Sequence, residues 1–378
     1  MHALDWIAWG TALPTFTGLG LALWHDAHLP ELPEEAPASG APVCLLIPAR
    51  DEGREIFAAV SSWLAQDHGP LRLVVVDDGS TDATPEVLRT LAAAHPDRLA
   101  VLRNDHLPEG WLGKNHALHL AQAHPWARAA AWLLLADADV QAEPGLLRRA
   151  LAFAEGQPTD VLALLPAIDT GSAGERLALP LAAAGFLVLV PPHKVPDPRS
   201  FAFCGVGAFT LIRRSAYDAL GGHAAAPLEA IDDMMLARRA KVAGFVNRVA
   251  RGGPMLHLRM YHGLWSVIRA MRKNAMALPL WPLAPLGLAA TLLTFLAPLW
   301  LPFAGHPALA LLLWLLVPAL LGHVAQRTSR RPMDLLWALW PLLGPPLALG
   351  QAWAFWDRLR GINHWRGRSV KLDGPRAR

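Results

Sequence analysis

The sequence predicts an α/β chain with a mostly parallel sheet, flanked at both ends by membrane helices. From residue 43 onward, short apolar runs alternate with segments of helical periodicity, and long uncharged stretches lie at both ends of the chain. Of the 378 residues, 53% are hydrophobic and only 17% are charged. Because an average soluble domain has about 25% charged residues, an entirely soluble or disordered protein is not expected.

The N-terminal segment is expected to be a membrane anchor. Ala3–Trp24 contains a single charge, Asp5, and its length suits a spanning helix, which needs about 20 apolar residues. A signal peptide is the alternative, but the segment lacks a basic start and a small-residue cleavage site. Residues 1–25 are therefore assigned to the anchor, and the proline-rich residues 26–42 to a linker.

The polar body, residues 43–260, is expected to form the sheet. Near-continuous apolar strands between helices are typical of parallel sheets covered on both faces, and ligands bind at the carboxyl ends of such strands. The expected strands are Val43–Pro48, Leu71–Asp77, Arg98–Arg103, Ala131–Ala136 and Val161–Pro166. The expected helices are Arg54–Leu64, Thr84–His95, Asn115–His124 and Gly145–Glu155.

Acidic residues crowd the ends of three of these strands. They occur in Arg50-Asp51-Glu52, in Asp77-Asp78-Gly79 and in Asp137-Ala138-Asp139. Because carboxylates repel one another, a cation is expected among them, and oxygen-only ligands favour Mg²⁺ or Mn²⁺ over zinc. Taken alone, the second motif could be a turn with a helix cap, and the third could occur by chance. Dinucleotide and Walker loops are absent, which argues against NAD enzymes and P-loop NTPases.

The C-terminal third is expected to enter the membrane. Residues 278–356 are mostly uncharged, and the basic clusters between the apolar stretches should face the cytoplasm. The last stretch contains three prolines around Gly344, so it either spans or is re-entrant. Residues 261–277 mix apolar and basic side chains, as interfacial amphipathic helices do. The basic tail, residues 357–378, favours a membrane surface or phosphate over nucleic acid, because no nucleic-acid-binding motif accompanies it.

Six motifs, in order and spacing, resemble the family 2 glycosyltransferases, which are inverting enzymes with the GT-A fold, a Rossmann-like and mostly parallel sheet. The motifs are IPARDEG (47–53), VVDDGSTD (75–82), GWLGKNHAL (110–118), LADADV (135–140), CGVGAFTLIRR (204–214) and IDDMMLARRAKVAG (231–244). The chain is most similar to membrane enzymes that glycosylate lipids, namely the hopanoid-associated, carotenoid (diaponeurosporenoate-type) and ceramide glucosyltransferases.

The resemblance implies roles in binding a nucleotide sugar. Asp78 would contact the nucleotide, and further pocket residues would be Pro48, Arg50, Glu52 and Asp77. Asp137 and Asp139 would hold the divalent metal ion, Asp139 more directly. Lys114 would face the diphosphate or the sugar, although a solvated lysine at the start of a helix is the alternative.

The resemblance also implies the catalytic group. Asp233, beside Asp232, would be the general base that takes the proton of the acceptor hydroxyl; capping of a helix by the two acids is the alternative. One departure is that the Gln/Arg-x-x-Arg-Trp motif, which processive polysaccharide synthases and the ceramide enzymes carry, is absent. The candidates for the diphosphate or acceptor contact are therefore Arg259, Tyr261 and Lys273.

The expected activity is transfer of a sugar from a nucleotide sugar to a lipid hydroxyl, with a UDP-sugar as the favoured donor. The expected location is the cytoplasmic leaflet of the cell (inner) membrane, with a multi-pass chain and a cytoplasmic catalytic domain. Two alternatives stay open. One is a polyprenyl-phosphate glycosyltransferase, whose acceptor needs no strong base; the other is a non-catalytic membrane scaffold that retains the fold. Cys44 and Cys204 are expected to be buried, reduced thiols.

Overall fold

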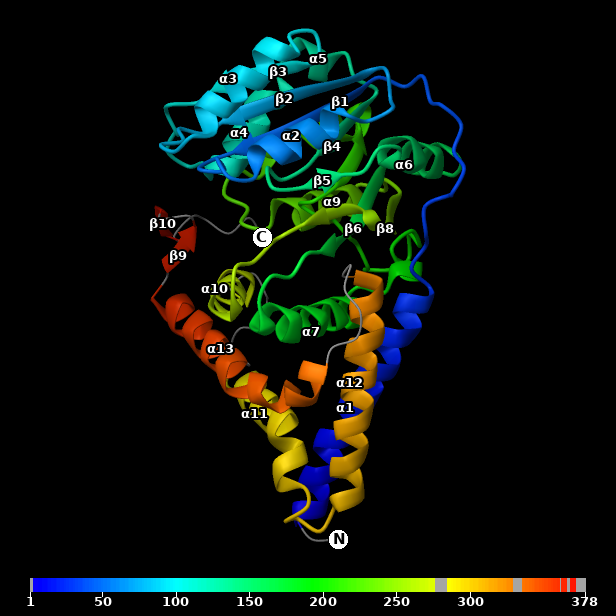
Figure 1. Cartoon of the computed structure of the whole chain (residues 1–378), viewed down its shortest axis with the longest axis vertical. Coiled ribbons are helices and arrows are strands. Elements are labelled where there is room, and N and C mark those ends of the chain that lie inside the picture. The colour runs from blue at the N-terminus through cyan, green and yellow to red at the C-terminus, as the bar shows by residue number, and fades with distance from the viewer. Residues whose placement is uncertain (1–2, 276–283, 329–334, 361, 366–367, 372–378) are drawn as a thin grey trace. The chain divides into compact units, whose positions relative to one another are not determined.

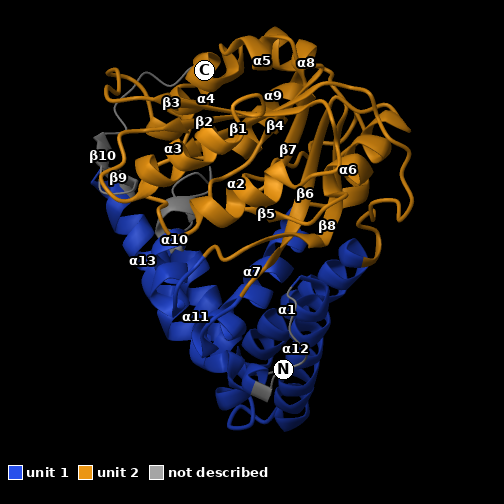
Figure 2. Ribbon diagram, turned by 45° about the horizontal axis from the view of Figure 1, so that its top comes forward, with its two compact units in different colours: residues 1–26, 170–189, 261–378 blue, residues 27–169, 190–260 orange. Residues whose placement is uncertain are grey.

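The computed structural model describes residues 3–275, 284–328, 335–360, 362–365 and 368–371. The chain divides into two compact units (Figure 2). Unit 1 comprises residues 1–26, 170–189 and 261–378, and unit 2 comprises residues 27–169 and 190–260.

Unit 2 is built on an eight-stranded sheet (Figure 1). Its strands are β1 Val43–Ala49, β2 Leu71–Asp77, β3 Leu99–Arg103, β4 Trp132–Leu135, β5 Gln141–Ala142, β6 Val161–Ile168, β7 Thr210–Arg213 and β8 Asn247–Leu258. They lie in the order β3-β2-β1-β4-β7-β6-β8-β5. β1 to β4 are parallel, as are β6 and β8, whereas β7 and β5 run antiparallel to their neighbours. The predicted mostly parallel α/β fold is confirmed.

The five expected strands all form, and three further strands complete the sheet. β5 and β7 have only 2 and 4 residues, too short for a clear alternation of apolar and polar positions. β8 is long, but it contains Gly252-Gly253-Pro254, and the register between β6 and β8 shifts near this point. Because glycine and proline usually indicate a turn rather than a strand interior, β8 was not predicted from the sequence.

Helices cover both faces of the sheet. They are α2 Ile56–Leu64, α3 Thr84–Ala94, α4 Gly113–Gln122, α5 Pro125–Arg128, α6 Leu146–Glu155, α8 Arg214–Ala219 and α9 Asp232–Val242, with 3-10 turns η1 Pro192–Lys194 and η2 Gly222–Ala225. Successive strand side chains point to opposite faces. Leu45 and Ile47 of β1 therefore pack with α2 and α6, while Cys44 and Leu46 pack with α4 and α9. Both cysteines are free and buried, as predicted.

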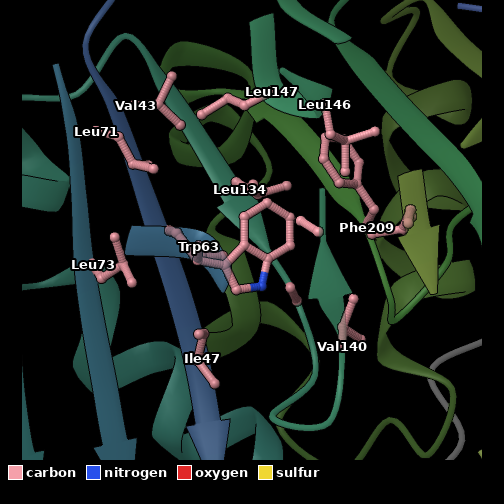
Figure 3. Close-up of a cluster of buried hydrophobic side chains, with 14 of the residues drawn as sticks. Val43, Ile47, Trp63, Leu71, Leu73, Leu134, Val140, Leu146, Leu147 and Phe209 are labelled. Atoms are coloured by element: carbon pink, nitrogen blue, oxygen red, sulfur yellow. The ribbon is translucent and has the colours of Figure 1, made fainter. Parts of the chain in front are cut away.

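The core on the α2 face is organised around Trp63 (Figure 3). Its side chain is fully buried, and its ring centroid lies 6.2 Å from that of Phe209. The indole nitrogen makes no hydrogen bond within the described chain. Trp63 therefore contributes through burial and packing alone.

Unit 1 is helical, with one small hairpin. Its elements are α1 Ala3–Ala27, α7 Ala173–Leu189, α10 Leu264–Ala275, α11 Ala284–Trp300, α12 Pro307–Thr328, η4 Leu335–Leu343, α13 Gly344–Leu359, β9 Ile362–Trp365 and β10 Arg368–Lys371. Small side chains of α1, Ala8 and Ala12, share a core with Leu313 and Val317 of α12. At the other end of α1, the buried Asp26 carboxylate forms an ion pair with Arg327 at 2.8 Å.

Two helical segments, which lie wholly or mostly in unit 1, are long and apolar enough to cross a membrane. By length and composition these are Ala173–Lys194 and Pro307–Thr328. Large apolar side chains also remain exposed on α1 and α12. They include Leu4, Trp6, Ile7, Leu13, Leu311, Trp314 and Leu315.

Candidate active site

Two loops at the carboxyl ends of β1 and β2 are held together by side-chain hydrogen bonds. The Asp51 backbone N–H donates to Ser80 Oγ at 3.0 Å, and Asp51 Oδ1 accepts from the Thr81 N–H at 2.8 Å. Asp51 adopts a φ of 53°, a conformation that is unusual for a residue with a side chain. These reciprocal bonds stabilise it, and they fix the loop that follows β1 against the loop that follows β2.

The paired aspartates at the end of β2 have different surroundings. Asp77 is buried and accepts hydrogen bonds from the Ser80 N–H and the Arg103 guanidinium, so it supports the loop. Asp78 Oδ1 accepts from the Asn104 side-chain amide at 2.5 Å. Arg50 donates to the Asp78 carbonyl at 2.6 Å, and its guanidinium lies 3.7 Å from the Asp78 carboxylate. Asn104, which the sequence did not single out, is therefore a member of this group.

A second group of charges is centred on Lys114, in the first turn of α4. Its Nζ lies 2.8 Å from Asp137 Oδ1 and 3.2 Å from Asp232 Oδ1. Burial alone would lower the pKa of Lys114, but Asp137, Asp232 and Asp233 more than offset this and raise it well above its usual value. The lysine therefore stays charged and joins two motifs that are far apart in the sequence.

The two neighbouring acids at the start of α9 have opposite pKa shifts. Burial and the negative charge of Asp232 raise the pKa of Asp233 to about 6. Burial would also raise the pKa of Asp232, but the charge of Lys114 lowers it below its usual value. Neighbouring acids whose pKa values are pushed apart are typical of general acid–base sites. Asp233 has the pKa that suits a general base near neutral pH.

Two glycines of the Cys204-Gly-Val-Gly segment let the chain approach these acids. A Cβ at Gly207 would lie 2.6 Å from Asp137 Oδ2 and 3.4 Å from Lys114 Nζ. A Cβ at Gly205 would overlap the Asp233 carbonyl group. A side chain at Gly207 would force the Asp137 carboxylate to move, and a side chain at Gly205 would force the backbone of Asp233 to move. The two glycines therefore allow the close approach that shapes this site.

Hydrogen bonds tie α4 to the segment that leads into α9. The side-chain amide of the buried Asn115 lies 2.9 Å from the Glu229 carbonyl and 3.1 Å from the Pro227 carbonyl. The Leu112 N–H also donates to the Pro227 carbonyl at 2.9 Å. Lys114 lies between Leu112 and Asn115, so these bonds fix its position relative to Asp232.

A buried histidine completes the surroundings of Asp232. His223 Nε2 lies 3.7 Å from Asp232 Oδ2, and His223 Nδ1 lies 2.7 Å from the Tyr217 hydroxyl. The sequence analysis missed both residues, although Gly221-Gly222-His223 follows the CGVGAFTLIRR motif closely. The two consecutive glycines could have indicated a close approach of the backbone.

Most of the other predicted site residues lie in or after strands β1, β4 and β8. Pro48 lies in β1, half-buried, and Glu52 is half-buried in the loop after β1. Asp139 is half-buried two residues after Asp137. Arg259 is exposed after β8 in unit 2, whereas Tyr261 belongs to unit 1. The side chain of the remaining candidate, Lys273, lies outside the described residues.

The donor atoms fit a divalent ion that brings further ligands with it. Asp137 and Asp139 offer only carboxylate oxygens, which are suitable ligands for Mg²⁺ or Mn²⁺. Among the described residues, no group of three or more His, Cys, Asp or Glu side chains is placed to hold a metal ion. Mg²⁺ is commonly bound through one or two carboxylates together with substrate phosphates, and two aspartates would suit such a site.

Comparisons with known proteins show the fold and the family of this chain. The structure resembles that of a mannosyltransferase from Pyrobaculum calidifontis, solved in complex with GDP-Man and Mn²⁺, with a TM-score of 0.55 and 20% identity over 94% of this chain and 99% of that one. A stretch of 96 residues, 25% of this chain, is 33% identical to the 4,4'-diaponeurosporenoate glycosyltransferase of Staphylococcus aureus, and it spans only 23% of that protein. The model of the glycosyltransferase-like family 2 matches residues 41–257, more than half of the chain. The chain belongs to this family of glycosyltransferases.

Proposed function

We propose that this glycosyltransferase transfers a sugar from a nucleotide sugar, a UDP-sugar in the first place, to a hydroxyl group of an apolar lipid. The observation that carries the proposal is the Lys114 group, in which one cation contacts Asp137 and Asp232 beside the half-buried Asp233. This group provides a cation that can bind the negatively charged sugar donor and a carboxylate that can accept the proton of a neutral acceptor.

Asp233 acts as the general base. It takes the proton of the acceptor hydroxyl while the hydroxyl oxygen attacks the anomeric carbon of the sugar. A carbon–oxygen bond forms as the bond to the diphosphate breaks, and the nucleoside diphosphate leaves with the electron pair. A single displacement inverts the anomeric centre. A pKa of about 6 leaves Asp233 ionised at neutral pH and still basic enough to accept the proton.

Asp137 and Asp139 would hold a divalent ion, which would supply positive charge to balance the negative charge of the donor diphosphate. Mn²⁺ accompanies GDP-Man in the Pyrobaculum mannosyltransferase structure. Lys114 lies 2.8 Å from Asp137, so it is well placed to contact the same phosphates. The Asp78, Asn104 and Arg50 group binds the nucleotide, with Pro48 and Glu52 at its border.

The acceptor is proposed to be a membrane lipid. Exposed apolar patches of this extent are costly in water and are typical of membrane-contacting surfaces. Unit 1 exposes large apolar side chains on α1 and α12, and two segments are long and apolar enough to span. The Staphylococcus relative is named for 4,4'-diaponeurosporenoate. We propose a multi-pass location in the cell membrane, with unit 2 in the cytoplasm. The reason is the positive-inside rule, by which basic residues next to membrane spans, such as Arg327, lie on the cytoplasmic side.

The test is sugar transfer by the purified full-length protein in detergent or lipid. Radiolabelled UDP- and GDP-sugars are incubated with Mn²⁺ and a total bacterial lipid extract, and the label in the lipid phase is counted for wild type and for Asp233→Asn. Label that enters the lipid phase with wild type only supports the proposal. If Asp233→Asn keeps most of the activity, the acceptor is a phosphate such as polyprenyl phosphate, which needs no strong base. If wild type neither transfers sugar nor binds nucleotide, the protein is a scaffold that retains the fold.

A further inference from the structure

His223 is buried beside the proposed base, and the mechanism above gives it no role. Its side chain is only 3% exposed. One ring nitrogen, Nε2, faces Asp232 Oδ2 at 3.7 Å and makes no hydrogen bond within the described part of the chain. A buried polar atom without a hydrogen-bond partner is destabilising, so its presence here needs an explanation.

The hydrogen bonds of Tyr217 determine which nitrogen of His223 carries the proton. The Tyr217 hydroxyl oxygen accepts a hydrogen bond from the His223 backbone N–H at 3.3 Å. Burial raises the pKa of the phenol, so the phenol keeps its proton. In the described structure, the acceptor within reach of that proton is His223 Nδ1, at 2.7 Å. A neutral imidazole that accepts at Nδ1 carries its proton on Nε2, which is the nitrogen that faces Asp232.

The backbone around His223 is shaped to hold this pair. Gly221 and Gly222 have φ values of 71° and 53°, which favour glycine. A Cβ at Gly222 would lie 2.5 Å from the Tyr217 ring, so only glycine lets the ring pack here. Arg239 of α9 donates to the Gly222 carbonyl at 2.9 Å. This bond ties the turn to the helix that begins with Asp232.

We propose that Tyr217 and His223 form a positioning pair, in which the Nε2 proton of His223 holds the Asp232 carboxylate in place when Lys114 turns toward the sugar donor. The inference rests on the proposed function, because it takes Asp233 as the base and the donor diphosphate as a competing partner for Lys114.

The distances explain why the contact is made only with the donor bound. Without a diphosphate, Lys114 attracts Asp232 through Oδ1 at 3.2 Å, and His223 lies beyond hydrogen-bond range of Oδ2. When the diphosphate attracts Lys114, the buried Asp232 carboxylate loses its nearest cation. A movement of under 1 Å brings Nε2–H within hydrogen-bond range of Oδ2. Asp232 then keeps its position, and Asp233 beside it keeps its orientation toward the acceptor.

Three variants of the full-length protein test the pair in the lipid-transfer assay. His223→Leu removes the donor to Asp232, and we expect kcat to fall roughly 10- to 100-fold while KM for the nucleotide sugar changes less than about twofold. His223→Gln places an amide N–H near the position of Nε2, so kcat should recover to within about threefold of wild type. Tyr217→Phe, which leaves the tautomer free, should lie between these two.

The matched control is His68→Leu. His68 is equally buried, and its Nε2 bonds the Ala41 carbonyl at 2.9 Å, away from both charge groups. This variant makes the same substitution at a buried histidine and should keep the wild-type kcat. Equal kcat values for His223→Leu and His223→Gln would overturn the proposal, because a role in packing alone does not depend on the N–H.

A spectroscopic measurement separates this inference from the proposed function. In protein labelled with ¹⁵N-histidine, the His223 signals are assigned by their loss in His223→Gln. We expect a proton on Nε2 in wild type and a mixture of tautomers in Tyr217→Phe. A proton on Nδ1 in wild type would overturn the positioning pair even if sugar transfer is observed. Conversely, an Nε2 proton in a protein that transfers no sugar would leave the pair intact and refute only the proposed function.

Discussion

Replacement of the proposed base, Asp233→Asn, should abolish sugar transfer and at the same time stabilise the protein at neutral pH. A carboxyl group whose pKa is raised in the folded state binds its proton more tightly when folded than when unfolded. Its contribution to stability is therefore fully present below the unfolded pKa and is lost as the pH rises through the folded pKa. For Asp233 this loss occurs between about pH 4 and pH 6. An asparagine at this position does not ionise, so the variant does not lose this stability as the pH rises.

The size of the effect follows from the pKa. The value rises from 3.8 to about 6, and one pKa unit corresponds to about 1.4 kcal/mol. The free energy of unfolding of Asp233→Asn should exceed that of wild type by at most about 3 kcal/mol at pH 7.5. Because Asp232 contributes part of the shift, the gain is an upper bound for the pair. For a domain of the size of unit 2, this upper bound corresponds to a rise in Tm of roughly 6–12 °C.

The assay is thermal unfolding of wild type and variant in detergent from pH 4 to pH 8. The difference in Tm should be small at pH 4, widen up to about pH 6 and level off above about pH 7. Asp232→Asn is the matched control, and it should have the opposite sign. Lys114 lowers the pKa of Asp232, so this contribution is present at neutral pH and is lost in acid. A destabilised Asp233→Asn, or a difference independent of pH, would refute the assignment of the raised pKa to Asp233.

Three further outcomes are expected. Gly207→Ala should lower sugar transfer at least about tenfold, because its Cβ would lie 2.6 Å from Asp137 Oδ2. The control is Gly69→Ala, where the structure leaves open space around the added Cβ. This control should keep the wild-type kcat/KM. Trp63→Ala should destabilise unit 2 by about 3–5 kcal/mol in urea unfolding, whereas Trp63→Phe, which removes an indole N–H without a partner, should cost less than half as much. EDTA should abolish transfer, and added Mg²⁺ or Mn²⁺ should restore it in wild type but not in Asp139→Asn; full activity in EDTA would contradict the metal assignment.

The parts of the fold that could be predicted are those encoded by local patterns. β2 has the predicted bounds, Leu71–Asp77, because a continuous apolar run ends at a charged turn. β7 and β8 were not predicted, since one is four residues long and the other contains turn-forming residues. Their place in the sheet depends on pairing with β4 and β6, which lie far away in the sequence. Such pairing is a tertiary effect that overrides local propensity.

The candidate site shows the same division. Asp78, Asp137 and Asp233 were proposed as site residues because each lies in a short motif at the end of a strand or the start of a helix, and their roles stay predictions. The partners of these groups could not be found this way. Asn104 bonds Asp78 across 26 residues of sequence, and His223 faces Asp232 from a 3-10 turn. Their positions beside Asp78 and Asp232 depend on tertiary geometry that no local spacing encodes.

The balance of charge around Lys114 gives an independent reason to expect a cation that arrives with the donor. Asp137, Asp232 and Asp233 bring three carboxyl groups close to one ammonium group. A nucleotide diphosphate adds further negative charge, and like charges that are close together and partly buried repel strongly. Lys114 cannot neutralise both the acids and the phosphates. A divalent ion held by Asp137 and Asp139 would balance the excess and would free Lys114 for the diphosphate, which is the situation in which His223 becomes the partner of Asp232.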